Sequence, residues 1–444
     1  MRSLSRNLAA VASIALGTLA AGGMARAENL QGRWAATTLQ NGVTIPFRLE
    51  ISGDGNKVVG TLFNGEDKEF TTSGSIHNGK VELNFDHYLT SIVATVKDGE
   101  LDGQIISRRA GPAAEGAFTR RGGAAVGEGV PDHTGNPFHA VRYVPPATAR
   151  ATDAPSIDGV WEILIESPKG EKAWRLIVTQ KGAEITTTIL RVDGDTGALT
   201  GSWQDGKFVA SHFDGSRPGL IVLTPQADGS LEVNLNAGQR TGILTAYRPE
   251  VARAKGLPEP ANYQTHTTVR DPNEVFTYSF PDTHGKILSN EDPQFKGKVV
   301  LAIVTGTWCP NCHDEAQYLV ELYAKYHDQG LEIVALDFEE PEQQNTLQRV
   351  NAFIKQYKVP YPYLIAGAPS EMWDKVPQAV NLNTWPATLF IGRDGKVKAT
   401  HSGFAAPGSG IYHAELRQEF TANIERLLKE QPAVNTSAAV AAAR

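Results

Sequence analysis

The chain of 444 residues is long enough for roughly three domains of ~100–200 residues each. Its formal net charge of −7 at pH 7 excludes the basic surface on which nucleic-acid binding depends. Only two cysteines occur, at positions 309 and 312, so the chain is not a scaffold held together by structural disulfides.

The first 27 residues have the pattern of a secretory signal peptide. Arg2 and Arg6 precede an apolar stretch from Leu8 to Leu19, and Ala25-Arg26-Ala27 forms an A-x-A cleavage site. The apolar stretch is too short to span a membrane, and no cysteine near the cleavage site offers a place for a lipid anchor. Cleavage would remove three arginines and no acidic residue, which changes the net charge from −7 to −10. We therefore expect a periplasmic or otherwise extracytoplasmic protein with no membrane span in its mature chain.

Residues 28–110 and 156–248 are predicted to be two copies of one antiparallel all-β module. Polar and apolar residues alternate within each, and Asn-Gly or Asp-Gly pairs at short intervals are typical of hairpin turns. A constant offset of 127 residues relates the two segments: it aligns Gly32 with Gly159, Trp34 with Trp161, residues 47–49 with 174–176, Gly55 with Gly182 and Gly74 with Gly201. We expect barrels or sandwiches whose cores are anchored by Trp34 and Trp161. The alternative, that these rings line a ligand pocket, has no further support in the sequence.

Three segments lack the periodicity of folded elements. Residues 111–155 are rich in Gly, Ala and Pro and are predicted to be a linker, and residues 249–272 a second linker. The Ala-rich residues 432–444 are expected to be a disordered tail. The remaining segment, residues 273–431, is therefore the third domain.

Strand signals alternate with helix signals in residues 273–431, which predicts an α/β domain whose sheet is covered on both faces. Strands are expected at residues 298–305, 331–338, 361–365, 387–391 and 397–400. Helices are expected at residues 310–329, 342–357, 370–380 and 412–429.

The sequence Cys309-Pro310-Asn311-Cys312 lies where the first of these strands gives way to a helix. Pro310 suits the first helical position because its missing N–H is not needed there. Cys309 is therefore expected at a helix N-terminus, where the helix dipole favours the nucleophilic thiolate over the thiol. Two cysteines in one helical turn are close enough to bridge, so we predict a redox-active disulfide in which Cys309 attacks a partner disulfide and Cys312 resolves the mixed disulfide.

With this motif and its surroundings, residues from about 276 to 428 resemble a thioredoxin-fold domain, close to the extracytoplasmic thiol–disulfide oxidoreductases of the TlpA/ResA type. The resemblance rests on residues 295–301, on residues 306–312 with Glu315, and on residues 385–391 and 393–396. It covers about a third of the chain, and residues 345–380 resemble the central insertion of this group.

The resemblance implies roles for the residues around the cysteines. Glu315 would accept the Cys312 proton, although a carboxylate in the first helical turn also simply favours the helix dipole. Pro386 resembles the cis-proline that faces the cysteines in this fold, with an ordinary trans proline as the alternative, and it would leave the backbone of Trp385 free to pair with a substrate strand. Trp385 replaces the Thr, Val or Gly often found there and would narrow the site or stack on substrate. Trp308 would shield the buried side of the cysteine pair or serve only as a core residue.

The cysteine motif has two other possible functions, a zinc site and a haem attachment site. A zinc site would need two further ligands, and no second C-x-x-C occurs. Cys312-His313 completes a C-x-x-C-H sequence, the signature of covalent haem attachment, and Met372 is the one methionine that the cleaved chain would keep as an axial ligand. The preceding strand and Trp385-Pro386 favour the thioredoxin interpretation, in which no metal or other cofactor is expected and His313 is an exposed helix residue.

The sequence thus predicts an exported thiol–disulfide oxidoreductase that reduces protein disulfides. The direction of reduction, the protein substrates and the electron donor, which would be an upstream redox protein or a membrane electron donor, follow from the resemblance alone. A second hypothesis assigns the main function to the β modules. The protein would then be an envelope binding protein, and the thioredoxin domain would be accessory.

Overall fold

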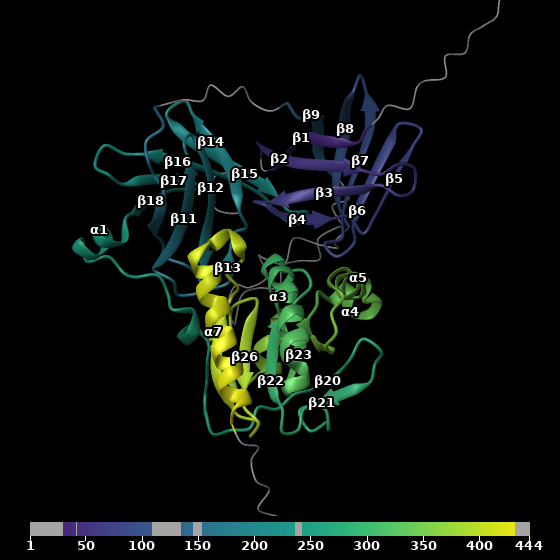
Figure 1. Ribbon diagram of the computed structural model, residues 1–444, viewed down its shortest axis with the longest axis vertical. Coiled ribbons are helices and arrows are strands. Elements are labelled where there is room, and N and C mark those ends of the chain that lie inside the picture. Colours follow the sequence, from purple (N-terminus) through teal and green to yellow (C-terminus); the bar gives the residue numbers. More distant parts are fainter. Residues whose placement is uncertain (1–29, 41, 109–134, 145–152, 236–241, 431–444) are drawn as a thin grey trace, which may run out of the picture.

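The computed structural model describes residues 30–40, 42–108, 135–144, 153–235 and 242–430. The predicted signal peptide, the predicted tail and most of the first predicted linker lie outside these residues. Figure 1 shows an all-β region at the top of the molecule and an α/β domain, coloured green to yellow, below it.

The first half of the all-β region consists of antiparallel strands in the spatial order β4-β3-β2-β1-β9-β8-β7-β6-β5. Alternate residues of these strands are buried, as the sequence pattern predicts for a sheet with one face toward a core. The predicted core residue Trp34 is buried there. The strand bounds are β1 Gly32–Gln40, β2 Val43–Ser52, β3 Val59–Asn64, β4 Asp67–Phe70, β5 Ser73–His77, β6 Lys80–Phe85, β7 Thr90–Lys97, β8 Glu100–Ser107 and β9 Asn136–Arg142.

Strand β9 corrects the prediction that residues 111–155 are a linker throughout. It lies between β1 and β8 and pairs with both. Its seven residues have only a short alternation, and Pro137 falls within them. The strand forms because two neighbours offer unpaired edges, and such tertiary pairing outweighs weak local propensity.

The second half of the all-β region contains a closed barrel. Its strands pair in the ring β10-β11-β12-β14-β15-β16-β17-β18 and back to β10, while β13 pairs with the end of β12. Trp161 is buried in its core. The strand bounds are β10 Gly159–Leu164, β11 Ala173–Lys181, β12 Glu184–Arg191, β13 Gly194–Asp195, β14 Leu199–Gln204, β15 Lys207–Phe213, β16 Pro218–Pro225, β17 Leu231–Asn234 and β18 Ile243–Tyr247.

The second predicted linker, residues 249–272, also contains regular structure. It holds helix α1 (Pro249–Ala254), helix α2 (Tyr263–His266) and strand β19 (Thr268–Val269). β19 pairs with β25 (Ala379–Val380) of the α/β domain, and the Thr400 hydroxyl donates to the carbonyls of Gln264 and Thr267. This segment is therefore docked on the domain that follows it.

The α/β domain has a five-stranded sheet in the order β24-β23-β22-β26-β27, in which β22 pairs in parallel with β23 and antiparallel with β26. Alternate residues of β22 enter two separate hydrophobic clusters, one on each face, because side chains alternate along a strand. Helices α3, α5 and α7 cover one face. The bounds are β20 Ser279–Pro281, β21 Ile287–Ser289, β22 Val299–Thr305, α3 Pro310–Tyr326, β23 Leu331–Phe338, α4 Pro341–Thr346, α5 Gln348–Tyr357, β24 Tyr363–Gly367, α6 Met372–Lys375, β26 Ala387–Ile391, β27 Val397–Ser402 and α7 Ile411–Leu428.

This domain follows the sequence prediction closely, with two differences. The predicted helix at 342–357 is divided into α4 and α5 at Leu347, which has the left-handed φ of 50° and ends α4. The predicted helix at 370–380 is reduced to a short turn and α6, because residues 379–380 pair with β19 instead. Strands β23 and β26 have the predicted bounds.

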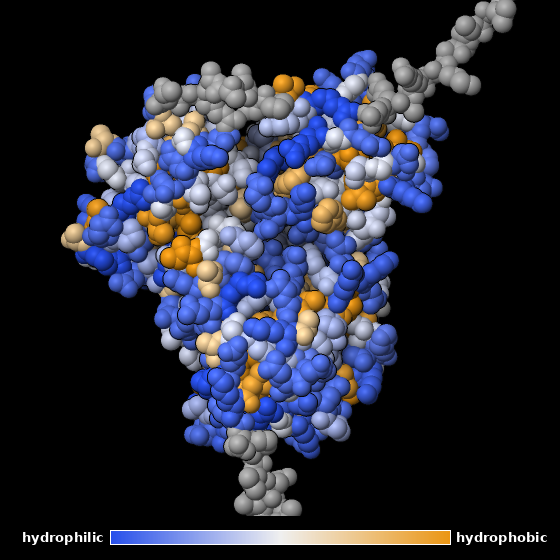
Figure 2. Space-filling model, viewed as in Figure 1, coloured by the Kyte–Doolittle hydropathy of each residue, from blue (hydrophilic) through white to orange (hydrophobic). Residues whose placement is uncertain are grey.

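The face of the molecule in Figure 2 is mostly hydrophilic, and its hydrophobic side chains form separate small groups. Within the described residues, no helix combines the length and hydropathy needed to cross a membrane.

Candidate active site

The two cysteines lie at the carboxyl end of β22, where the chain turns into α3. Cys309 is the N-cap residue of this helix and Pro310 occupies its first position, as predicted. The Cys309 carbonyl accepts the backbone N–H of Cys312 at 3.0 Å and of His313 at 3.3 Å, which starts the helix. Both cysteines are free thiols, and only 5% of Cys309 and 1% of Cys312 is exposed.

Cys312 is the more protected of the two thiols. Burial raises its pKa well above the ordinary value, and the neighbouring Cys309 raises it further, against opposing hydrogen bonds from the Thr305 hydroxyl and the Gly306 backbone. Because the thiolate is the reactive form, Cys312 needs a base before it can attack.

Glu315 is the candidate for such a base, and it is buried one helical turn beyond Cys312. Its side chain is 1% exposed, and the Thr388 hydroxyl donates to its Oε1 at 2.6 Å. Burial raises the pKa of Glu315 to about 8, with the Thr388 hydrogen bond opposing the shift. A carboxyl group that titrates near 8 can exchange a proton with a thiol at neutral pH, whereas the helix-dipole alternative gives no reason for its burial.

The aromatic residues predicted for the site pack inward. The Trp385–Pro386 peptide bond is cis, as predicted. The rings of Trp308 and Trp385 meet edge to face with centroids 5.2 Å apart, and both belong to the same hydrophobic cluster as the cysteines. Trp308 also donates from Nε1 to the Phe338 carbonyl at 2.9 Å. Trp385 therefore closes the site around the sulfurs and does not present its ring for stacking.

The backbone of Trp385 is engaged, contrary to the expectation that it is free. Its carbonyl accepts the Cys309 thiol at 3.5 Å, and its backbone lowers the pKa of the nearby carboxyl group of Asp193, which follows strand β12 of the barrel. The Asp193 carbonyl in turn accepts the Asn311 Nδ2 at 2.8 Å. The sequence gives no signal for this contact, because Asp193 precedes Asn311 by 118 residues.

His313 corrects a second expectation, since it is fully buried. Its Nε2 donates to the Thr307 carbonyl at 2.7 Å and its Nδ1 hydrogen-bonds the Tyr357 hydroxyl at 2.9 Å. Its ring stacks on Tyr88 of the first β unit, 4.2 Å between centroids. With both nitrogens engaged, His313 offers no ligand to a haem iron, so the C-x-x-C-H motif does not fit haem attachment.

A buried ionic network supports the start of α3, and sequence reasoning missed it. Arg349 of α5 pairs with Glu339 at 2.5 Å and Glu340 at 2.7 Å, and its Nε donates to the Thr307 hydroxyl at 3.1 Å. Glu339 also accepts the Thr307 N–H at 2.7 Å. Opposite charges raise the pKa of Arg349 against the effect of burial. The network fixes Thr307, two positions before Cys309.

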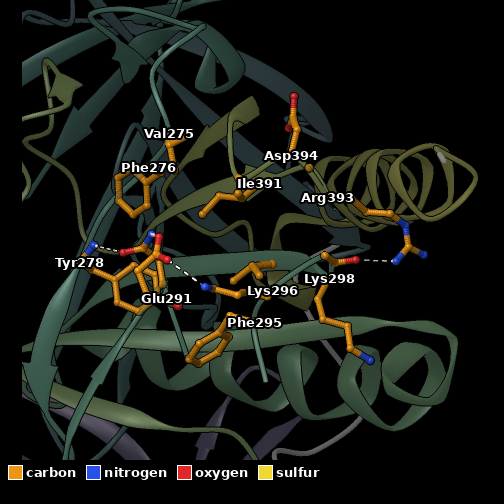
Figure 3. A pocket seen from close by; sticks show the side chains of 15 residues that line it. Val275, Phe276, Tyr278, Glu291, Phe295, Lys296, Lys298, Ile391, Arg393 and Asp394 are labelled. Carbon is orange, nitrogen blue, oxygen red and sulfur yellow. Dashed lines mark hydrogen bonds and ion pairs between the residues drawn. The ribbon is translucent and has the colours of Figure 1, made fainter. Parts of the chain in front are cut away.

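A pocket of about 250 Å³ lies elsewhere in the domain. Figure 3 shows the rings of Phe276, Tyr278 and Phe295 toward one side of it and Arg393 toward the other. It adjoins the amino end of β22, whereas the cysteines follow the carboxyl end of this strand. Among the described residues, no group of three or more His, Cys, Asp or Glu side chains is placed to hold a metal ion.

Comparison with known proteins agrees with this geometry for the C-terminal domain. Residues 272–400 match the family model described as AhpC/TSA family, so this part of the chain is an AhpC/TSA-type thioredoxin-fold domain. A thiol-disulfide oxidoreductase ResA of Bacillus cereus is 36% identical over 126 residues, which are 28% of this chain and 64% of that protein. A ResA protein of Halalkalibacterium halodurans is 28% identical over 141 residues, 32% of this chain and 73% of that protein. The chain thus spans less than two thirds of the length of the first of these relatives.

Among solved structures, a thiol:disulfide interchange protein of Chlorobium tepidum is 19% identical, with a TM-score of 0.28, and covers 36% of this chain and 99% of its own. A hypothetical protein of Sinorhizobium meliloti is 22% identical, with a TM-score of 0.31, and covers 39% of this chain and 92% of its own.

Proposed function

We propose that this AhpC/TSA-type domain makes the protein a thiol–disulfide oxidoreductase. The observation that carries the proposal is the free Cys309/Cys312 pair at the start of α3, with Glu315 buried on the same helix and its pKa raised to about 8. The named ResA relatives support the same activity for the matched residues.

In the proposed reaction, the Cys309 thiolate attacks one sulfur of a substrate disulfide. The substrate S–S bond breaks, a mixed disulfide forms and the first substrate thiolate leaves. Glu315 then takes the Cys312 proton, and the Cys312 thiolate attacks the Cys309 sulfur. This releases the second substrate thiolate and leaves a Cys309–Cys312 disulfide, so that two electrons pass to the substrate. A separate dithiol donor must reduce this disulfide before the next cycle.

We also propose an extracytoplasmic location, with protein disulfides as substrates and an upstream redox protein or a membrane electron donor as the source of electrons. The signal-peptide pattern of residues 1–27 supports the location. A compartment in which disulfides form also supplies the disulfides that such an enzyme would reduce.

The two β units are proposed to be copies of one module, of residues 28–142 and 156–248, which extends the first copy to include β9. Equivalent tryptophans support this. Trp34 donates from Nε1 to the carbonyl four residues before it, and Arg142 lies over its ring at 4.1 Å. Trp161 does the same toward Ile157, with Arg248 over its ring at 3.9 Å.

The reduction potential of the cysteine pair tests the proposed function. Equilibrating the full mature chain in glutathione buffers should give a reversible two-electron transition, within the range of about −270 to −120 mV spanned by C-x-x-C proteins. Cys309→Ser should abolish it. A potential near the lower limit would support a reductase, whereas one near the upper limit would make the protein a disulfide donor. The absence of any two-thiol transition would refute the oxidoreductase proposal.

A further inference from the structure

A tight loop of the barrel lies on the cysteine site. We name residues 192–195, which comprise the turn after β12 and the two residues of β13, the cap loop. Figure 1 shows β13 at the lower edge of the barrel, where it meets the α/β domain. Gly194 of the loop pairs in parallel with Phe404, just beyond β27. A strand of the barrel thus extends onto the thioredoxin-fold domain.

The cap loop holds the residues on both sides of Cys309. The Asp193 carbonyl accepts the Asn311 Nδ2 at 2.8 Å, and the Trp385 backbone lies near enough to the Asp193 carboxylate to lower its pKa. Trp385 is the residue whose carbonyl accepts the Cys309 thiol, and Asn311 lies within the cysteine motif. These contacts use the Trp385 backbone, to which a substrate strand would pair according to the family resemblance.

The loop is seated against backbone with no space between the two surfaces. A Cβ added at Gly194 would lie 2.2 Å from the Phe404 carbonyl oxygen, and one added at Gly403 would lie 2.3 Å from the Gly194 nitrogen. Asp195 anchors the end of the loop, because its buried carboxylate accepts the Ala406 N–H at 2.8 Å and the Ser409 hydroxyl at 2.6 Å.

Asp193 is suited to a contact that opens. About 19% of its side chain is exposed, and Lys169 of the barrel pairs with its carboxylate. Burial would raise its pKa, but Lys169 and Arg191 lower it more, so Asp193 carries its charge at neutral pH. When the loop leaves, the Asp193 carboxylate keeps Lys169 as a partner and keeps some contact with solvent. This costs less free energy than leaving a charge buried without a partner.

We propose that the cap loop occupies the substrate groove and that Asp193 is a specificity-determining residue, because a polypeptide disulfide has to displace the loop before it can pair with Trp385. This inference rests on the proposed function of the cysteine pair. With 5% of Cys309 exposed, no bulky disulfide reaches the sulfur while the loop is docked. A small disulfide requires less displacement than a polypeptide does.

The docking of the loop is tested by alkylation of Cys309 with iodoacetamide in the reduced full chain. Asp193→Ala removes a charge-assisted hydrogen bond and should speed alkylation about tenfold or more. Gly194→Ala puts a methyl group against Phe404 and should have a similar effect with no change of charge. Rates are compared at the plateau of the pH profile, where Cys309 is fully ionised. A change in its thiolate fraction then cannot explain a difference in rate.

The matched control is Asp228→Ala, which removes an aspartate from another hairpin turn of the same barrel, where it accepts hydrogen bonds from the Ser230 N–H and hydroxyl. Its alkylation rate should equal that of the wild type. If both loop variants keep the wild-type unfolding midpoint and neither is alkylated faster, the docked loop does not limit access and the proposal is overturned.

Specificity is tested with two disulfides of different size. Asp193→Ala should increase the reduction rate of insulin, a polypeptide disulfide, several-fold more than that of oxidised glutathione. An equal increase for both would overturn the assignment of specificity to Asp193. Alkylation needs only a reachable thiol, so faster alkylation in a protein that shows no redox transition would refute the proposed function and leave the docked loop established.

Discussion

At the scale of single residues, the two sulfurs differ in their surroundings. Cys309 begins the helix and hydrogen-bonds the Trp385 carbonyl, whereas Cys312 lies deeper and burial raises its pKa. Glu315, on the helical turn after Cys312, is a buried carboxylate of α3. This division predicts separate roles that can be measured separately.

A trapping experiment distinguishes the two cysteines. Cys312→Ser should accumulate a mixed disulfide between Cys309 and a protein substrate, because no second thiol is left to resolve it. Non-reducing electrophoresis with mass spectrometry detects the adduct. Cys309→Ser is the matched control and should trap nothing, and adducts of equal yield in both variants would contradict the assigned order of attack.

Glu315 should make the stability of the fold depend on pH. Its pKa is about 8 in the folded protein against 4.5 for an ordinary glutamate, so the folded state binds more protons between these values. The stabilisation is complete below about pH 4.5 and is lost as the pH rises through 8. Urea unfolding at pH 5 and pH 8.5 should show a smaller decrease in the free energy of unfolding for Glu315→Gln than for the wild type.

The same substitution should slow the step that needs Glu315 as a base. Resolution of a preformed mixed disulfide should become slower at pH 7 in Glu315→Gln, while the first attack by Cys309 keeps its rate. Stopped-flow measurement of the two phases separates them. Equal slowing of both phases would show that Glu315 acts only on the fold.

At the scale of secondary-structure elements, α5 is tied to the ends of β22 and β23 by Arg349. The guanidinium is fully buried, and both carboxylates that face it would be left without a counter-charge by its removal. Arg349→Met should therefore lower the free energy of unfolding by about 3–5 kcal/mol in a denaturant titration. Arg270→Met, which breaks an exposed bidentate pair with Glu274, should stay close to the wild type. A small effect at Arg349 would mean that the network adds little net stability.

Elements with a local signal were predictable, and those that depend on distant partners were not. Strands β23 and β26 follow from short apolar runs, and the start of α3 follows from Pro310. Strand β9 has little pattern of its own and depends on β1 and β8. His313 has the polar character of a surface residue, and it is buried between α5 and Tyr88 of the first β unit, more than 200 residues earlier.

At the scale of the whole molecule, three units meet around α3. Asp314 lies at this junction, and its pKa is raised well above the ordinary value by burial and by the negative charges of Asp195, Glu69, Asp214 and Asp67 from the all-β region. The sequence identified the cysteine site but could not place these carboxylates together, because they come from three separate segments of the chain.

The junction should weaken as the pH rises. A carboxyl group whose pKa is raised by folding stabilises the protein while it is protonated, and this contribution disappears when the group ionises beside other negative charges. The thermal midpoint should therefore decrease more with rising pH in the wild type than in Asp314→Asn. The exposed Asp328→Asn, near the other end of the same helix, should behave as the wild type. Identical pH profiles for all three proteins would contradict the role of Asp314.

The attachment of the cap loop to the same chain has a consequence for the kind of partner that the site selects. A tethered segment competes at an effective concentration that is commonly in the millimolar range, whatever the concentration of the protein. A partner present at micromolar concentration must therefore bind about a thousandfold more tightly than the loop, a difference of about 4 kcal/mol. Disulfide-bearing proteins that bind weakly would therefore not displace the cap loop. A dedicated partner that makes additional contacts with the barrel would displace it.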